Sequence, residues 1–322
     1  MTRNSIFFHQ TNRRTKYSLP RRARTRMTPL RRTPVRRGRP ADNDDTSATR
    51  ATEVTLENNM DVICMYKQTP TPEETAGLVR KKMDEFEDVL GEIHPGRKQG
   101  YLMAAKRCPD QCDDAFKLVF LRCEVFNVKS AVQRWVRYWD TRIKVFGEDK
   151  AFLSLTVDNA RDCAAGMDYL QVARQSDPDG RAILLFDFNK DGTEVPSEIL
   201  ERAVWCQIHR ALATESAQKR GVVVYCKAVD SIFQWRISLS KKIAVSGKGI
   251  LPIRFAGMHI VHPPAHVQYL LSVTRIIVGP KLRNRFYVHS GSEEEIFHSL
   301  SSFGLGTKEM LPTLFGGSLN FC

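Results

Sequence analysis

The sequence predicts an α/β fold: a mostly parallel β-sheet with flanking helices, preceded by a small all-α helical lobe and a basic tail. Three observations lead to this prediction. Short apolar runs alternate with helical patterns over residues 151–322, as in sheets whose strands are joined by crossover helices. Amphipathic helical patterns without strand signals fill residues 71–150. Residues 1–70 have no apolar periodicity and are rich in Arg, Thr, Asn, Asp and Pro, which indicates disorder.

The tail carries the net charge of the whole chain. Residues 1–40 contain twelve Arg, one Lys and no acidic residue, which accounts for the formal charge of +13, and the rest of the 322-residue chain is neutral. Because a nucleic-acid-binding domain keeps its basic charge on the folded part, we expect no nucleic-acid partner. The tail is compatible with a nuclear address, an organelle transit peptide, a tether to anionic lipid, or a solvated segment with no folded role.

Three helices are predicted in the lobe that precedes residue 150. The first, over residues 72–93, has apolar residues at near-helical spacing, namely Leu78, Met83, Phe86 and Leu90. The second, over residues 113–125, opens at an aspartate cap, Asp113 or Asp114. The third, over residues 128–147, ends in a glycine and carries a broad apolar stripe that consists of Val132, Trp135, Val136, Trp139 and Ile143.

Strands and helices alternate after residue 150. Two apolar runs, residues 169–173 and 181–188, flank the turn sequence SDPDG and predict a β-hairpin. The remaining predicted elements are, in order, a helix over 197–218, a strand over 221–229, a helix over 237–245, a strand over 253–261, a long apolar helix over 265–278 and a basic helix end over 279–290. The strands are apolar at nearly every position, as a sheet covered on both faces requires.

The chain has no motif that indicates catalysis, a metal or a cofactor. It lacks the GxSxG elbow and the GxxxxGK[ST] phosphate loop. His259, His262 and His266 straddle a strand and a Pro-Pro turn, so their spacing does not define one helical face. The sequence DFNKDG superficially resembles the start of a calcium loop, but Asp and Asn beside Gly are the usual residues of turns. We therefore expect no catalytic residue, no metal and no cofactor.

Cysteine usage and hydropathy indicate the compartment. Eight cysteines are scattered along the chain without a secretory h-region, which indicates reduced intracellular thiols. No apolar run reaches the roughly 18 residues that a membrane-spanning helix needs. We expect a cytoplasmic monomer whose membrane contact is peripheral.

Several short motifs stand in a fixed order along residues 110–320. They are the FLR motif at 120–122 with the following Phe126, the Pro-Ile-Arg at 252–254, His262-Pro263, Leu311-Pro312 and the Phe-Gly-Gly at 315–317. In this order and spacing they resemble the CRAL-TRIO lipid-binding and transfer family. The resemblance implies a soluble carrier with one deep apolar cavity between the sheet and a mobile gate helix, residues 265–278, which takes one lipid out of a membrane.

The resemblance also implies which residues form the site. The expected lipid-binding residues are Val222, Val224, Cys226, Ile243, Leu251, Ile253 and Met258, with His266, Leu270 and Val273 closing the cavity from the gate helix. Strand alternation offers a second face, that of Val223 and Tyr225, and we expect the first face to line the cavity. In tocopherol-transfer members of the family, positions that match Arg254, Lys281 and Arg285 make a phosphoinositide contact near the gate, so these three are the expected membrane-binding residues.

Two departures from the family pattern bear on the ligand. Phosphatidylinositol-transfer members have an acidic residue where Ile253 stands, so its absence favours a tocopherol-, retinoid- or carotenoid-like ligand over phosphatidylinositol. The asparagine that usually follows the central strand is His262, which bears on the gate hinge. The expected function is therefore transport of one hydrophobic lipid between membranes. The alternative is a lipid-regulated protein-interaction module that acts as a signalling or trafficking scaffold.

Overall fold

A computed structural model describes most of the chain after residue 65. The described residues are Tyr66, 68–156, 161–190, 195–228, 230, 236–267, 271 and 283–321, without the side chains of Asp162 and Arg283. The predicted tail lies outside them up to residue 65, and so does most of the predicted helix over 265–278. No helix in this described part of the chain is long and apolar enough to cross a membrane.

The α/β class and the mostly parallel sheet are confirmed. Five strands lie side by side in the order of the sequence, β1 (Leu170–Ser176), β2 (Ala182–Asp187), β3 (Val222–Lys227), β4 (Phe255–Val261) and β5 (Phe286–His289). β1 pairs antiparallel with β2, which confirms the predicted hairpin, and all other neighbours are parallel. Because each parallel strand is added at the same edge, right-handed crossovers bring the connecting helices to one face of the sheet.

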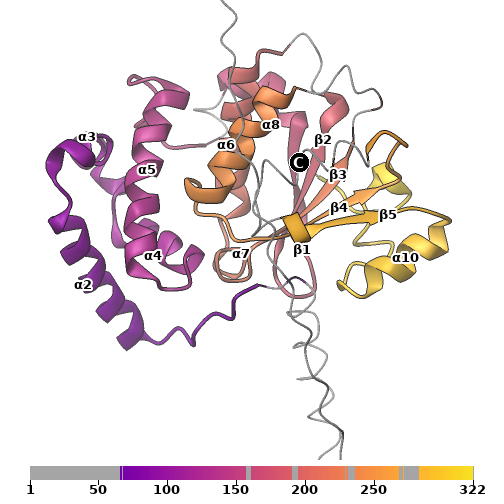
Figure 1. Cartoon of the computed structure of the whole chain (residues 1–322), viewed down its shortest axis with the longest axis horizontal. Helices are drawn as coiled ribbons and strands as arrows, with labels where there is room; N and C mark the ends of the chain where they lie inside the picture. Colours follow the sequence, from indigo (N-terminus) through magenta and orange to yellow (C-terminus); the bar gives the residue numbers. More distant parts are fainter. Residues whose placement is uncertain are drawn as a thin grey trace, which may run out of the picture. The chain divides into compact units, whose positions relative to one another are not determined.

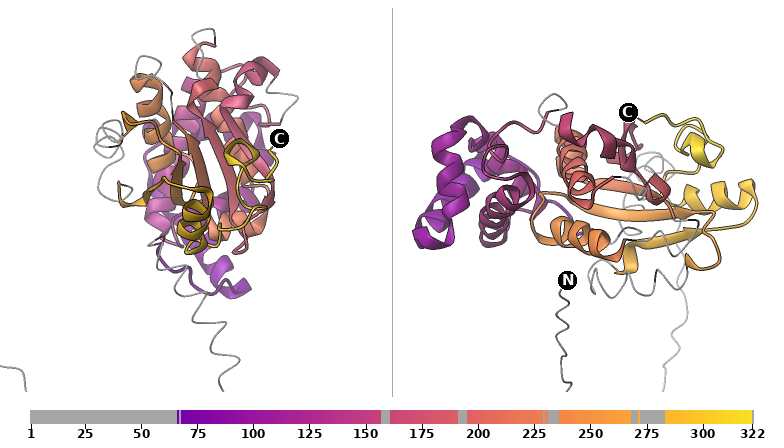
Figure 2. Two further views of the ribbon diagram at one scale, coloured as in Figure 1. Left: turned by 90° about the vertical axis from the view of Figure 1, so that its right-hand side faces the viewer. Right: turned by 90° about the horizontal axis from the view of Figure 1, so that it is seen from above.

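The two faces of the sheet are covered by different parts of the chain. Leu184 and Val224 face the connecting helices, while their neighbours Ile183, Val223 and Tyr225 face the C-terminal segment. Figures 1 and 2 show the resulting order: the first helices of the described chain, then the connecting helices, then the sheet, then the yellow C-terminal segment. Both faces are buried, which explains why the strands are apolar at nearly every position.

The connecting helices are α6 (Ser197–Ala211), α7 (Glu215–Arg220) and α8 (Ile237–Gly249). The single helix predicted over 197–218 is thus divided in two. The side chain of Thr214 accepts a hydrogen bond from the backbone N–H of Ala217 and begins a new helix there. Such a threonine cap competes with continuation of the preceding helix.

Helices before residue 150 form a lobe that we call the N-terminal lobe. It comprises α2 (Ala76–Glu92), α3 (Gln99–Arg107), α4 (Asp114–Cys123) and α5 (Val128–Phe146). The cap at Asp113 and the stop at Gly147 are confirmed, whereas α3 was not predicted because its nine residues are too short for a clear apolar period. The lobe packs around Trp135, whose ring lies 5.0 Å from that of Phe120 and 5.8 Å from that of Trp139.

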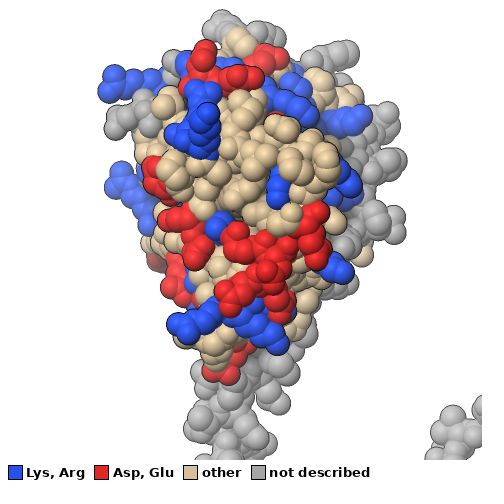
Figure 3. Space-filling view, turned by 90° about the vertical axis from the view of Figure 1, so that its left-hand side faces the viewer, with Lys and Arg blue, Asp and Glu red and all other residues tan. Residues whose placement is uncertain are grey.

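The outer surface of this lobe carries an acidic band (Figure 3) beside basic residues such as Arg80 and Lys81. The exposed side of α2 carries Asp84, Glu87, Asp88 and Glu92. Figure 3 shows acidic side chains gathered in a band across this side of the molecule. A surface of this charge repels anionic phosphate groups, so it is an unfavourable side for contact with an anionic membrane or a nucleic acid.

The C-terminal segment covers the second face of the sheet. Phe286–His289, which was predicted as part of a basic helix end, is the edge strand β5 instead. This prediction was wrong because the basic residues precede the strand, whereas Phe286 and His289 are buried by pairing with β4. Helix α10 (Glu293–Ser301) follows, opened by a capping box between Ser292 and Glu295.

The chain before α2 is anchored on the second face of the sheet. We call Tyr66 and residues 68–71 the N-terminal strap. Tyr66 is 0% exposed although the sequence placed it in the disordered tail. Its ring lies against Gly257, where an added Cβ would stand 2.7 Å from the ring. The glycine is therefore required by this close approach, and the ordered chain begins earlier than Pro72.

A buried chain of hydrogen bonds links the strap to the C-terminal segment. The Tyr66 hydroxyl lies 2.9 Å from His259 Nε2, His259 Nδ1 lies 2.9 Å from His289 Nε2, and His289 Nδ1 lies 2.6 Å from Ser299 Oγ. Burial lowers the pKa of His289 to about 4 and that of His259 well below its usual value. Both imidazoles are therefore neutral, and each ring can donate once and accept once along the chain.

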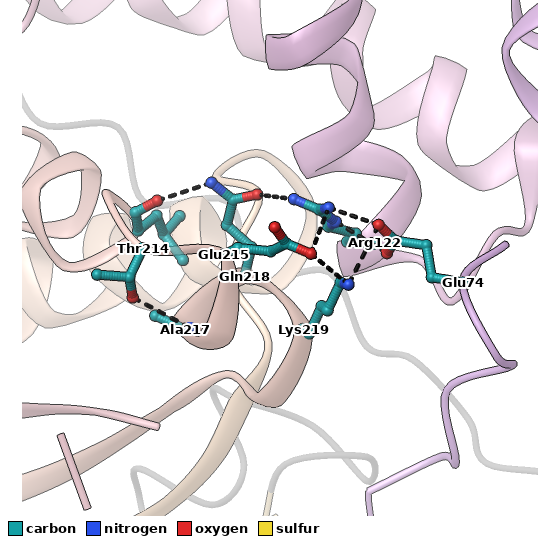
Figure 4. A network of polar contacts seen from close by, with 8 residues as sticks. Glu74, Arg122, Thr214, Glu215, Ala217, Gln218 and Lys219 are labelled. Atoms are coloured by element: carbon teal, nitrogen blue, oxygen red, sulfur yellow. Dashed lines mark hydrogen bonds and ion pairs between the residues drawn. The ribbon is translucent and has the colours of Figure 1, made fainter. Parts of the chain in front are cut away.

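A network of polar contacts joins the N-terminal lobe to α7 (Figure 4). Arg122 in α4 donates through Nε to Glu74 Oε2 at 3.0 Å and also bonds Gln218, and its Nη2 lies 3.3 Å from Glu215. Lys219 bridges Glu74 and Glu215. The hydrogen bond from Arg122 lowers the pKa of Glu74. The arginine of the FLR motif therefore ties the two parts of the described chain together.

We expect Arg122→Met to lower the free energy of unfolding by about 3 kcal/mol, because it leaves the poorly exposed carboxylate of Glu74 without its main partner. Urea unfolding followed by circular dichroism measures this change. Arg97→Met, at an exposed arginine, is the matched control and should change stability by less than about 0.5 kcal/mol. Equal effects of the two substitutions would contradict the role given to Arg122.

The buried imidazoles predict a dependence of stability on pH. As pH falls from 6.5, the unfolded histidines take up protons while His289 stays neutral down to about 4, so the folded state loses stability. In His289→Gln this loss should be smaller by about 1.4 kcal/mol per pH unit. Denaturant midpoints across this range test it, with the exposed His298→Gln as the control. An unchanged slope in His289→Gln would refute the assignment.

Candidate functional site

A cavity of about 580 Å³ lies against the face of the sheet that carries the connecting helices. Side chains of β2, β3 and β4 form one wall, and α8 with Val267 and Leu271 forms another. The N-terminal lobe contributes residues of α5 and of the turn after α4, and the strap contributes Gln68 and Thr69. The volume falls within the roughly 300–1,000 Å³ that small-molecule sites occupy.

The register of the strands builds the apolar wall. Leu184 stands beside Val224, and Val224 beside Met258, in the parallel ladders. Two residues further along, the same ladders align Phe186 with Cys226 and Cys226 with Ile260. Because side chains alternate along a strand, aligned residues project from the same face. All six line the cavity, whereas Tyr225 and His259 lie on the opposite face.

Helix α8 lines the cavity with one of its sides. Ile243 and Ala244 each stand three or four residues from both Ser240 and Gly247, so the four residues lie on one helical face. The C-terminal end of α8 is held by Arg134 of α5, which donates to Leu251 O at 2.6 Å and to Lys248 O at 3.1 Å. The bond to Lys248 O satisfies a carbonyl in the last turn of α8, and the bond to Leu251 O fixes the chain just beyond the helix.

Charged residues gather where the cavity meets the N-terminal lobe. Arg134 forms an ion pair with Glu124 at 2.5 Å. Arg254 is 9% exposed and donates to Thr71 Oγ1 at 2.6 Å, to Thr69 O at 2.8 Å and to Lys219 O. Burial lowers the pKa of Arg254. A buried guanidinium needs such acceptors, and here they come from the strap.

The side chains of the cavity are suited to holding an apolar molecule rather than to catalysis. Burial raises the pKa of Cys123 to about 11 and also raises that of Cys226, so both thiols stay protonated and are poor nucleophiles. The described lining residues include no histidine, and Glu124, the carboxylate among them, is bound to Arg134. A general base in reach of a nucleophile is therefore missing from the described wall.

The calcium-like sequence after β2 is engaged in turn contacts. If Asp187 is the first residue of a calcium-loop pattern, Asp191 is the fifth and Glu198 is the twelfth. Asp191 lies outside the described residues. Asp187 Oδ1 accepts the backbone N–H of Asn189, and Asn189 Oδ1 accepts that of Asp230. The described part of the chain contains no group of three or more His, Cys, Asp or Glu that could hold a metal ion.

The cavity brings together many of the residues that the sequence singled out. Val224, Cys226, Ile243, Ile253, Met258, Arg254 and Arg285 line it. Val222 and Leu251 are fully buried in the core beside it, and His266 is half-buried and not among the described lining residues. Leu270, Val273 and Lys281 lie outside the described residues.

Two of the three expected membrane-binding residues, Arg254 and Arg285, also make contacts within the protein. The guanidinium of Arg254 is occupied by the strap, and Arg285 donates to the backbone carbonyl of Phe255. Arg254 and Arg285 directly precede β4 and β5, and their acceptors lie in the strap, at the end of α7 and at the start of β4. Their first role in this structure is to hold the strap and the strand ends.

Other residues that line the cavity were not among the predicted site residues. Leu184, Phe186 and Ile260 follow from the same alternation that singled out Val224, once the neighbouring strands are aligned. The position of Cys123 and Arg134 in the cavity wall cannot be predicted from the sequence, because it depends on how α4 and α5 pack against the sheet.

The residue after β4 has an unusual backbone. His262 has a φ of +48°, a left-handed conformation in which asparagine, aspartate and histidine are enriched among non-glycine residues. Its N–H donates to His289 O at 3.0 Å. The histidine that replaces the family's asparagine thus occupies a conformation that both residue types tolerate.

Comparisons with known proteins bear on this fold and cavity. Residues 166–317 match the family model described as the CRAL/TRIO domain. The human protein named alpha-tocopherol transfer protein-like is 24% identical over 259 residues, which cover 76% of this chain and 71% of that protein. Human clavesin-2 is 27% identical over 255 residues, which cover 76% of this chain and 74% of that protein. The crystal structure of Sfh5 has 11% sequence identity and a TM-score of 0.46, and the match covers 67% of this chain and 82% of that one.

The matched residues run from the segment before β1 to the Phe-Gly-Gly near the C-terminus, and so they include all five strands and α8. They contain the whole apolar wall of the cavity. Residues 166–317 are therefore similar to a CRAL/TRIO domain, and this chain resembles members of the CRAL-TRIO family.

Proposed function

We propose that this chain carries one hydrophobic lipid between membranes and performs no catalysis. The observation that carries the proposal is the cavity of about 580 Å³ with an apolar wall formed by β2, β3 and β4. The match of residues 166–317 to the CRAL/TRIO family model supports lipid binding and transfer in general. The name of the relative alpha-tocopherol transfer protein-like supports a hydrophobic lipid as the ligand.

The size of the cavity favours a ligand with a single apolar chain. The cavity of about 580 Å³ lies within the range of sites that hold small molecules. A tocopherol- or retinoid-like molecule is closer to this size than a phospholipid with two acyl chains. Ile253 in the wall, in place of an acidic residue, also favours an uncharged ligand over phosphatidylinositol.

Transfer requires that the cavity compete with the bilayer. Each methylene group buried away from water contributes about 0.8 kcal/mol, and the bilayer offers the ligand a similar environment. The protein therefore needs only to match the membrane, and a small bias of a few kcal/mol decides loading or release. We propose that residues 265–278 act as a gate helix that supplies this bias. The burial of Val267 and Leu271, which line the cavity, supports this role.

We further propose that the carrier is cytoplasmic and binds anionic membranes peripherally, with Lys281 and Arg285 near the lipid headgroups. Arg285 is half-buried and lines the cavity, as do the exposed basic residues Arg137 and Lys248. Basic residues at such a surface each contribute about 1 kcal/mol of attraction to anionic lipid. Arg254 supports this site indirectly, because it holds the strap at the same end of the cavity.

We expect Ala244→Trp to weaken binding of a fluorescent tocopherol analogue by roughly tenfold or more, because the indole fills part of the cavity. A tenfold loss of affinity corresponds to about 1.4 kcal/mol of binding free energy. Ser238→Trp, on the exposed side of the same helix, is the matched control and should leave uptake unchanged. Circular dichroism checks that both variants fold. Normal uptake by folded Ala244→Trp would show that the ligand binds elsewhere.

We expect Lys281→Glu with Arg285→Glu to slow transfer between anionic vesicles more than it weakens uptake of the same analogue, because the charges act at the membrane. The control is Lys81→Glu with Lys106→Glu, on the exposed surface of the N-terminal lobe. Stopped-flow transfer and equilibrium uptake are measured on each protein. Equal loss of transfer and uptake in the first pair would argue against a membrane contact.

A further inference from the structure

Helix α8 has an exposed side that combines apolar and basic residues. Ile237 and Val245 are 51% and 52% exposed, although both are large and apolar. With Lys241 and Lys248 they stand at intervals of four, four and three residues, and so they form one stripe along the helix. We call these four residues the α8 stripe. Such exposure of apolar side chains beside lysines is typical of helices that lie in a membrane interface.

The charge of α8 is uniformly positive. Its thirteen residues include Lys241, Lys242 and Lys248 and no acidic residue. Lys242 lies 3.3 Å from Glu201 of α6, which runs beside α8 (Figure 1). No ion pair engages Lys241 or Lys248 within the described residues, and both side chains are exposed. These two charges are therefore available to an anionic partner.

The α8 stripe also adjoins the cavity. Lys248 belongs both to the stripe and to the wall of the cavity, and the exposed residues Gln133 and Arg137 line the same region. The cavity therefore reaches the surface between α5 and α8. On the outer side of the N-terminal lobe, by contrast, the acidic residues of α2 would repel anionic lipid (Figure 3).

We infer that the α8 stripe is a docking surface for an anionic lipid bilayer. Ile237 and Val245 enter the boundary between headgroups and acyl chains, while Lys241 and Lys248 contact phosphate and carboxylate groups of the lipids. Docking in this orientation turns the surface opening beside Lys248 toward the bilayer. In the proposed carrier, the α8 stripe is a second membrane contact. The inference rests on the proposed function only for the purpose of docking, because binding to vesicles is measured without a lipid ligand.

Vesicle binding of the full-length chain tests the inference. We expect Lys241→Glu with Val245→Ser to weaken binding to phosphatidylcholine–phosphatidylserine vesicles by roughly tenfold, through lost attraction and lost apolar insertion. The matched control is Lys106→Glu with Leu102→Ser, an exposed pair on α3 that also joins a lysine and an aliphatic residue four positions apart. Both pairs are also made in a chain whose tail arginines and Lys16 are replaced by glutamine, so that the basic tail does not mask the effect.

The outcomes separate docking from cargo binding. Loss of vesicle binding in the α8 pair, with the control pair unchanged and uptake of the tocopherol analogue retained, supports the inference. Equal binding of the two pairs in the tail-neutral chain overturns it. If the chain takes up no analogue but docks through α8, the carrier proposal fails while the docking surface stands. If binding and uptake fall together in the α8 pair, the substitutions act on the cavity and the docking surface is rejected.

Discussion

The common register of β2, β3 and β4 is the constraint on which the rest of the structure depends. Parallel pairing aligns Leu184, Val224 and Met258 on one face and Leu185, Tyr225 and His259 on the other. A shift of one residue in any of these strands would exchange its two faces. The first face then has to meet the connecting helices and the cavity, and the second has to meet the C-terminal segment and Tyr66.

Buried arginines connect the parts that the sheet itself does not reach. Arg122 joins α4 to the segment before α2 and to α7, Arg134 joins α5 to the end of α8, and Arg254 joins the start of β4 to the strap. Each guanidinium has several donors and carries a charge that is costly to bury without acceptors. The acceptors come from distant segments, so each arginine fixes the position of one segment against another. The cavity lies among these contacts, and its wall therefore depends on the N-terminal lobe as well as on residues 166–317.

Much of the fold was predictable because its elements are local patterns. The hairpin around SDPDG, the cap at Asp113, the stop at Gly147 and the apolar stripe around Trp135 each depend on residues within one or two turns of each other. The prediction failed where a neighbour in space decides the conformation. Phe286–His289 becomes a strand because β4 offers a free edge, and Thr214 divides α6 from α7 by a side-chain cap within a run that otherwise reads as one helix.

By itself the sequence determined the α/β class, the β1–β2 hairpin, the alternation of strands and helices up to β4, the sharing of one face of β3 by Val224 and Cys226, and the resemblance to the CRAL-TRIO family. Each of these depends on the identity and spacing of nearby residues. Only the tertiary structure decided that Arg254 turns inward to Thr69 and Thr71, that Tyr66 is buried against Gly257, and that Cys123 and Arg134 line the cavity. When two contacting residues are more than a hundred positions apart in the sequence, their contact depends on how the whole chain packs. The spacing of neighbouring residues does not predict such a contact.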